Sequence, residues 1–186
     1  MEQLNLHLRG IVPLLMHNNV TVNPLDEQTK AIKKYTGKRK KTDEDHLMIQ
    51  RLEWEAGLYH DAEIGPYVPG VNVETCFRDA AKLTKQGAAV TRSVVVSEER
   101  LPLIYKGLRD IRGLWESNFK DYRVVGNQQN SVMRCRPMFP VWSLDVPITL
   151  EASILDPGDL RDIAHRAGLM IGLGDYRPRF GRFEVE

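Results

Sequence analysis

The sequence predicts an α+β fold of the ferredoxin-like type, with the βαββαβ order of elements that RRM domains also have. Three observations predict it. Alternating apolar residues indicate a strand over residues 3–11, and apolar residues at helical spacing cover residues 71–84. A second alternation spans residues 142–151, followed by a well-capped helix and a last strand at residues 182–185. Because strand, helix and strand recur in both halves, a split βαβ arrangement accounts for the pattern.

The first half of the pattern contributes a strand, a helix and a second strand. Leu4, Leu6 and Leu8 fall on one face of the first strand, which is typical of a half-buried strand. The spacing within residues 71–84 predicts a helix that buries a single face, and the segment RSVVVS after it predicts the second strand. The residues of that helical face are Val73, Phe77, Ala80, Ala81 and Thr84.

The second half contributes a long strand, a helix and the last strand. Pro147 within residues 142–151 predicts an edge strand or a bulge, because proline cannot donate a hydrogen bond to a neighbouring strand. Asp156 at the cap position and Pro157 at the first position predict the start of a helix, which we expect to end at Gly172. The inward residues of the long strand are Trp142, Leu144, Val146, Ile148 and Leu150.

A long insertion, residues 12–70, separates the first strand from the first helix within a single domain over residues 1–186. Long insertions in compact domains are often functional. The last part of the insertion, EIGPYVPG at residues 63–70, predicts a rigid turn because it is rich in proline and glycine.

Two capped helices are predicted inside the insertion. Asp26 is placed to cap a short helix that ends near Gly37. Thr42 is placed to cap a second helix that ends near Gly57, with Asp45 at its third position. The apolar stripe expected on the second helix consists of Leu47, Met48 and Leu52.

Smaller elements are predicted between the second and third strands of the pattern. The segment LPLIY either extends the sheet or forms a short hairpin arm, and DIRGLWESNFK predicts a loop with a helical turn. Residues 121–126 and 130–139 predict a hairpin with GNQQ near its tip. Arg134 and Arg136 share one face of its second arm.

Global composition names no partner. The chain has 26 Lys and Arg against 25 Asp and Glu, a net charge of +1, so only local charge can indicate a ligand. Cys76 and Cys135 lie far apart in apolar contexts, which predicts buried thiols rather than a disulfide. The first ten residues lack the apolar run of a signal peptide, and no run approaches the roughly 18 apolar residues of a membrane span. We therefore expect a cytoplasmic protein without a membrane partner.

The segment GLGDYRPRFG, residues 172–181, is the first candidate binding element. Its glycines permit close approach of the backbone to another chain, and its guanidinium groups suit phosphate oxygens. Because the glycines follow a helix and precede a strand, their order is opposite to that of a dinucleotide-binding fingerprint. The alternative is a helix C-cap and turn with solvated arginines. The predicted phosphate-binding residues are Gly172, Gly174, Gly181, Arg177, Arg179 and Arg182.

A basic run is the second candidate binding element. Between Lys30 and Lys41 there are seven basic residues and no acid. Such a run would contact a nucleic-acid backbone without reading its sequence, or it is a solvated loop that the acids at residues 43–45 compensate. Arg134 and Arg136 add a third cationic spot, unless they only meet solvent. The residues of the run expected to hold a strand are Lys38, Arg39, Lys40 and Lys41.

Catalytic signals are weaker than binding signals. The histidines are scattered without the spacing of a zinc motif, and no Cys-x-x-Cys occurs, so neither a metal nor another cofactor is predicted. Asp26 could hold a metal or position a water, but no second carboxylate accompanies it in the sequence.

Two segments resemble the RAMP superfamily, the ferredoxin-like RNA-binding proteins of CRISPR systems. IGLGDYRPRFGRFEV is similar to the C-terminal glycine-rich loop of that family. GPYVPGVNVETCFRDAAKL is similar to the turn and amphipathic helix that follow the family's insertion, although it lacks the family's lysine after Pro69 and Gly70. The chain is most similar to the backbone subunit that polymerises along guide RNA, and it also resembles short reading frames of tailed-phage genomes.

The resemblance implies binding of single-stranded RNA, or of single-stranded DNA, with the insertion as a thumb-like element. It implies a homo-oligomer arranged head-to-tail along the strand, or a subunit of a ribonucleoprotein complex. Two alternatives stay open. One is a ribonuclease of the same fold that uses Asp26 or His17, which are matches to an aspartate and a histidine of the family's cleaving branches. The other is a protein-interaction module whose basic insertion docks on an acidic partner.

Overall fold

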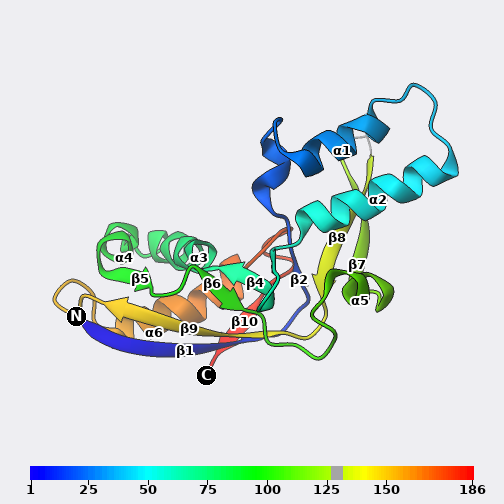
Figure 1. Cartoon of the computed structure of the whole chain (residues 1–186). Helices are drawn as coiled ribbons and strands as arrows, with labels where there is room; N and C mark the ends of the chain where they lie inside the picture. The colour runs from blue at the N-terminus through cyan, green and yellow to red at the C-terminus, as the bar shows by residue number, and fades with distance from the viewer. Residues whose placement is uncertain (127–131) are drawn as a thin grey trace.

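The computed structural model describes residues 1–126 and 132–186 as a mixed α+β protein with several antiparallel sheets. Most of the predicted hairpin tip GNQQ therefore lies outside the described residues. Figure 1 shows two parts, which we call the sheet unit and the arm. The sheet unit contains β1, β5, β9, β10, α3, α4 and α6, and the arm contains α1, α2, α5, β7 and β8.

The main sheet has the strand order β10-β1-β9-β5, and every neighbouring pair is antiparallel. Leu8 of β1 lies opposite Leu144 in β9 and Val185 in β10. This register places the predicted apolar residues of all strands on one face, where those of β9 are fully buried. The strands are β1 (Glu2–Gly10), β5 (Val94–Val96), β9 (Ser143–Leu150) and β10 (Phe183–Val185).

Pro147 lies in a central strand, so the predicted edge position is wrong. β9 pairs with β1 on one side and with β5 on the other. The backbone N–H of Ser97 donates to the Pro147 carbonyl at 2.9 Å, just beyond the last residue of β5. The sheet tolerates the proline because the neighbouring strand ends there, which leaves no ladder bond that needs a Pro147 N–H.

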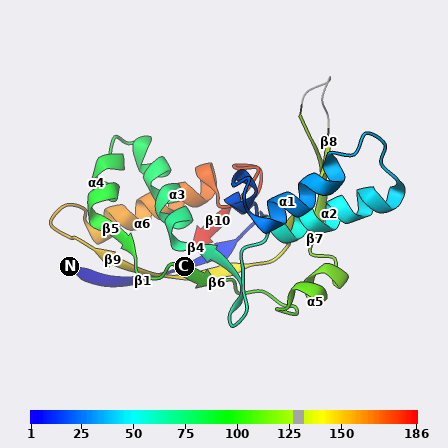
Figure 2. The same ribbon diagram turned by 45° about the horizontal axis from the view of Figure 1, so that its top comes forward.

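Three helices cover the apolar face of the main sheet (Figure 2). The predicted helix over residues 71–84 is confirmed as α3, except that Thr84 lies beyond its end and is exposed. The Asp156 cap and the Gly172 end are also confirmed, with a π-helical turn, η2, between α6 and Gly172. The short helix α4 was not predicted. The bounds are α3 (Gly70–Lys82), α4 (Gly87–Ser93), α6 (Pro157–Arg166) and η2 (Ala167–Ile171).

The arm consists of the two insertion helices packed on the hairpin β7–β8, with β2 paired to the other side of β8. Both predicted caps are confirmed. The Asp26 side chain accepts from the first turn of α1, and Thr42 and Asp45 form a reciprocal capping box on α2. The bounds are β2 (Leu14–Leu15), η1 (Asn19–Val22), α1 (Glu27–Thr36), α2 (Asp43–Gly57), α5 (Ile111–Glu116), β7 (Lys120–Val125) and β8 (Val132–Phe139).

The apolar stripe predicted for α2 is wrong. Leu47 is 64% exposed and Met48 is 41% exposed. Only the last turns of α2 pack in the core, through Trp54 and Ala56, and the Trp54 indole N–H donates to the Phe119 carbonyl at 2.8 Å. The first turns extend beyond the hairpin and bury only the capping residue Asp45 among their side chains.

The segment predicted as a rigid turn at residues 63–70 contains a strand. β4 lies between β3 and β6 in a small third sheet. Pro66 takes part in this sheet through its carbonyl alone, which accepts from Leu103 N at 2.9 Å. The segment LPLIY extends this small sheet and also bridges to β9, where Ile104 and Ser143 exchange backbone hydrogen bonds. The bounds are β3 (His60–Asp61), β4 (Gly65–Pro69) and β6 (Arg100–Pro102).

One apolar cluster joins the sheet unit and the arm. Trp54 and Cys135 of the arm belong to the same buried cluster as Leu6 of the main sheet. At the junction Phe139 contacts the ring of Tyr105, with centroids 5.0 Å apart. The shared core fixes the arm against the sheet. No helix in the described part of the chain is long and apolar enough to cross a membrane.

Candidate nucleic-acid interface

The glycine-rich segment, residues 172–181, forms a loop between η2 and β10 that we call the glycine loop. Gly172, Gly174 and Gly181 have φ between +70° and +78°, a region that side chains disfavour. A Cβ on Gly174 would lie 2.2 Å from the Leu15 carbonyl oxygen. The glycines therefore let this loop lie directly against the segment that contains β2.

The glycine amides do not face a ligand as predicted. Gly172 N donates to the Ala167 carbonyl at 2.9 Å, and Gly181 N donates to the Pro13 carbonyl at 2.8 Å. These two N–H groups are used inside the protein, because they close the helix end and attach the loop to the chain before β2. Gly174 is exposed and lines a cavity.

The glycine loop also contacts the arm. The Arg123 guanidinium of β7 lies over the Phe180 ring at 4.5 Å and over the Tyr176 ring at 5.1 Å. Arg123 is held by a two-bond contact with Asp121, at 2.8 and 3.0 Å. The loop thus lies between the sheet unit and the arm and touches both.

Arg177 and Arg179 are the cations that the loop presents to solvent. Both side chains are exposed, and neither takes part in an ion pair within residues 1–126 and 132–186. Arg182 is partly buried, and its Nε donates to the Pro178 carbonyl at 2.7 Å. Of the three predicted arginines, the first two are placed to meet a ligand.

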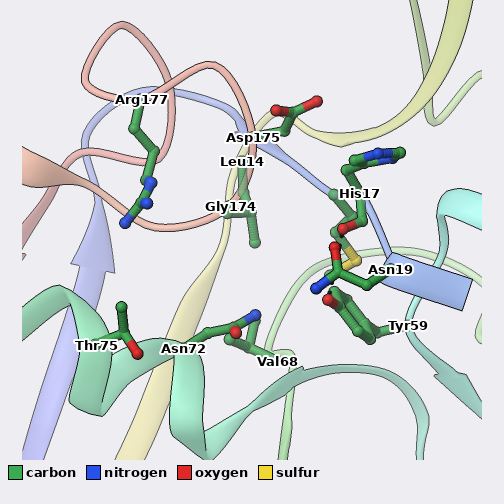
Figure 3. Close-up of a pocket in the computed structure, with 11 residues that line it drawn as sticks. Leu14, His17, Asn19, Tyr59, Val68, Asn72, Thr75, Gly174, Asp175 and Arg177 are labelled. Atoms are coloured by element: carbon green, nitrogen blue, oxygen red, sulfur yellow. Dashed lines mark hydrogen bonds between the residues drawn. The ribbon is translucent and has the colours of Figure 1, made fainter. Parts of the chain in front are cut away.

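A cavity of about 240 Å³ lies between the glycine loop and the first turns of α3. In Figure 3, Arg177 reaches toward it from the loop, while the amide groups of Asn19 and Asn72 point toward one another at its centre. The side chains that line it come from five segments of the chain. They are Leu14, Met16, His17, Asn19, Tyr59, Val68, Asn72, Thr75, Asp175 and Arg177, together with Gly174.

His17 separates this cavity from a second one in the arm, of about 390 Å³, which Lys33, Arg134 and Arg136 help to line. Nδ1 of His17 is buried and has no hydrogen-bond partner among the described residues. Burial, and next the nearby Arg136 guanidinium, lower the pKa of His17, while Asp175 acts in the opposite sense. Burial and the Arg136 guanidinium therefore favour the neutral imidazole over the charged one.

Arg134 and Arg136 do not form the free cationic spot that the sequence predicts. Arg134 forms an ion pair with the buried carboxylate of Glu53 on α2. Nε of Arg136 lies 3.1 Å from a carboxylate oxygen of Asp175, although the N–H does not point at that oxygen, and the Arg136 side chain is only 14% exposed. The same face of β8 packs on α2 and on the glycine loop, so internal acids compensate both charges.

The basic run lies apart from the glycine loop. Figures 1 and 2 both show the connection between α1 and α2 at the far end of the arm. Lys38 Nζ lies 2.5 Å from the Asp45 carboxylate, and Lys41 Nζ donates to the Lys38 carbonyl at 2.9 Å. Arg39 and Lys40 are exposed. The structure therefore does not bring residues 38–41 to the cavity.

Asp26, the candidate for metal binding or catalysis, is occupied by capping. One oxygen of its carboxylate accepts from Gln28 N at 2.8 Å and from Thr29 N at 3.2 Å. Among the residues that the structure describes, no group of three or more His, Cys, Asp and Glu is arranged to hold a metal ion.

Sequence reasoning missed the polar side chains of the cavity. Asn72 and Thr75 are three residues apart on α3, directly after the Pro-Gly turn and beside the buried face. That spacing was a usable signal. Asn19 and Tyr59 show no such pattern in the sequence, because only the folded insertion brings them to the same place.

A comparison with protein-family models found no match, and a search of curated proteins found no similar sequence.

Proposed function

We propose that this chain binds single-stranded nucleic acid, RNA in the first place, through the cavity between the glycine loop and α3. The observation that carries the proposal is the exposed Arg177, which reaches toward a cavity lined by polar groups from the start of α3. The α3 cap residue, Pro69, makes no side-chain hydrogen bond to the first turn, in which Gly70 N donates to the Glu99 carbonyl at 2.9 Å. Guanidinium groups and the first-turn amides of a helix both suit phosphate oxygens.

The architecture supports a RAMP-like, ferredoxin-like assignment as part of this proposal. Along the chain, the strands of the main sheet come in the order β1, β5, β9, β10. In space they lie in the order β10, β1, β9, β5, so the fourth strand is followed by the first, the third and the second. That order, with α3 and α6 as the connecting helices, supports the proposal of a βαββαβ unit. In this reading residues 12–70 are the thumb-like insertion, and most of them build the arm.

The open face of the main sheet gives no support to a base-stacking surface of the RRM kind. It presents a hydrogen bond between His7 and Asp145 and an ion pair between Arg9 and Glu184. Its strands carry no Phe, Tyr or Trp on that face. Stacking on the sheet needs aromatic side chains, so the edge at the glycine loop is the better interface.

Salt-dependent binding tests the proposal. Anisotropy of a labelled single-stranded RNA, and of a DNA of the same length, would be measured with the intact chain over a salt series. We expect the double variant Arg177→Ala/Arg179→Ala to weaken binding about tenfold or more, and to lower the salt slope by about 0.7 for each lost phosphate contact. The exposed Arg161 on α6 provides the matched control, Arg161→Ala.

Absence of binding by the wild-type chain to either strand would overturn the proposal. Equal losses of affinity in the double variant and in Arg161→Ala would exclude the glycine loop from the binding interface. The alternative in which the basic insertion docks on an acidic protein requires that random single strands leave the chain unbound.

We propose in addition that several copies associate along one strand, or that the chain is one subunit of a ribonucleoprotein complex. A head-to-tail contact that does not close generates a filament. Mass measurement on strands of increasing length tests this, because stepwise addition of copies is expected, and a single copy at every length contradicts it.

Among the residues that the structure describes, His17 favours a ribonuclease as a second candidate. A neutral imidazole beside a ligand cavity is suited to act as a general base. Incubation with labelled RNA, with and without magnesium, would give a product ladder that His17→Ala abolishes. An uncut RNA, bound but intact, removes this candidate.

A further inference from the structure

We propose that the cavity beside the glycine loop holds one unpaired nucleobase of the bound strand, an inference that rests on the proposed function. We call it the base pocket. It is defined by Leu14, Met16, Asn19, Tyr59, Val68, Asn72 and Thr75.

The floor of the base pocket is apolar. Leu14, Met16 and Val68 line it and belong to the main core. Tyr59 also lines the pocket, and its ring contacts the Tyr67 ring, whose centroid is 5.7 Å away. A phosphate gains nothing from such a surface, whereas both faces of a nucleobase pack well on apolar and aromatic groups.

Two side-chain amides face each other across the pocket. The amides of Asn19 and Asn72 point toward one another from η1 and from α3 (Figure 3). The hydrogen bonds formed by residues 1–126 and 132–186 use neither amide. Each amide offers donors and an acceptor, and the edge of a nucleobase carries both kinds of group, whereas a phosphate carries acceptors only. The amides therefore fit a base.

Charge determines on which side of the pocket the sugar-phosphate chain passes. Arg177 and Asp175 lie at different places on the rim (Figure 3). Asp175 is the residue whose carboxylate lies 3.1 Å from Arg136 Nε. A phosphate is attracted by the Arg177 guanidinium, whereas the Asp175 carboxylate already lies beside the Arg136 guanidinium. The sugar-phosphate chain therefore passes on the Arg177 side, with the base directed toward Asn72.

The test compares an intact labelled strand with a strand of the same length and charge whose bases are all replaced by abasic sites. We expect the abasic strand to bind about tenfold more weakly, which is the order of the loss when one stacked base is removed. Asn72→Ala and Asn19→Ala should weaken the intact strand and leave the abasic strand unchanged. Asn5→Ala, on the exposed face of β1, is the matched control.

The outcomes distinguish failure of the base pocket from failure of strand binding. Equal affinity for both strands, with no effect of Asn72→Ala, overturns the base pocket and leaves strand binding standing. Failure of both strands to bind overturns strand binding and the pocket together. Competition by a free nucleoside monophosphate at the affinity of the intact strand would assign the pocket to a free nucleotide and overturn the inference.

The test does not depend on a single variant, so loss of folding in one variant does not defeat it. Asn19 is exposed, so its truncation removes no packing from the core. Asn72→Asp keeps the size of the side chain and replaces the amide donors by acceptors. It should weaken the intact strand more than the abasic one, and an equal effect on both would mean a purely electrostatic role.

Discussion

At the scale of single residues, His17 couples the candidate interface to pH. Its pKa is lowered by burial and by Arg136, so below its ordinary value of about 6.5 the unfolded chain binds a proton that the folded chain does not. His17 therefore makes its full contribution to the free energy of unfolding above that pH. This contribution is lost as the pH falls from there toward the lowered pKa.

His17→Asn should flatten this dependence, because asparagine does not titrate. Urea unfolding of the wild type and the variant at a series of pH values would measure it. The exposed His165 on α6 gives the control, His165→Asn, which should keep the wild-type slope. Parallel slopes for wild type and His17→Asn would contradict the lowered pKa of His17.

Asp26 separates a structural role from a chemical one. Because its carboxylate caps α1, Asp26→Ala should lower the free energy of unfolding by about 1 kcal/mol, and Asp26→Ser should largely restore it. Thermal unfolding measures both variants. A loss of RNA cleavage in Asp26→Ser at unchanged stability would instead show that the carboxylate acts in chemistry.

At the scale of elements, the glycine loop connects three parts of the chain. A Cβ on Gly181 would meet the Leu173 backbone, and its φ is +70°. Gly181→Ala should therefore destabilise the protein by about 1–3 kcal/mol, the order of a strained backbone position. Denaturant unfolding measures it, with the exposed Arg179→Ala in the same loop as the control that keeps stability.

Elements whose signals are local could be predicted from the sequence. The caps at Asp26, Thr42 and Asp156 act within one helical turn, and the alternation of β9 reflects one buried face. Elements that depend on distant partners could not. β4 contains prolines that indicate a turn, and only its pairing with β3 and β6 makes it a strand.

The same difference between local signals and distant partners explains which features of the candidate site could be predicted. The arginines of the glycine loop stand out in the sequence, and two of them are exposed as predicted. Arg136 stands out equally, yet Asp175, far along the chain, compensates its charge. The use of the glycine amides inside the protein depends on the position of Pro13 and Leu15, which no local pattern reveals.

At the scale of the whole molecule, the arm and the sheet unit share one core, with the candidate interface where they meet. Arg123 and the glycine loop lie at this meeting point, beside the cavity that His17 divides from the one in the arm. A strand bound there would contact both parts, so its binding is expected to depend on their relative position.

The shared core has a consequence for thiol chemistry. Cys76 lies in the sheet unit and Cys135 in the arm, both fully buried, and burial raises the pKa of the first thiol to about 12 and of the second to about 11. Only the thiolate is alkylated readily, so iodoacetamide should react with either cysteine only after the fold opens. If one core opens as a unit, peptide mass spectrometry will record equal labelling rates at both cysteines, and faster labelling of Cys135 would reveal an arm that detaches on its own.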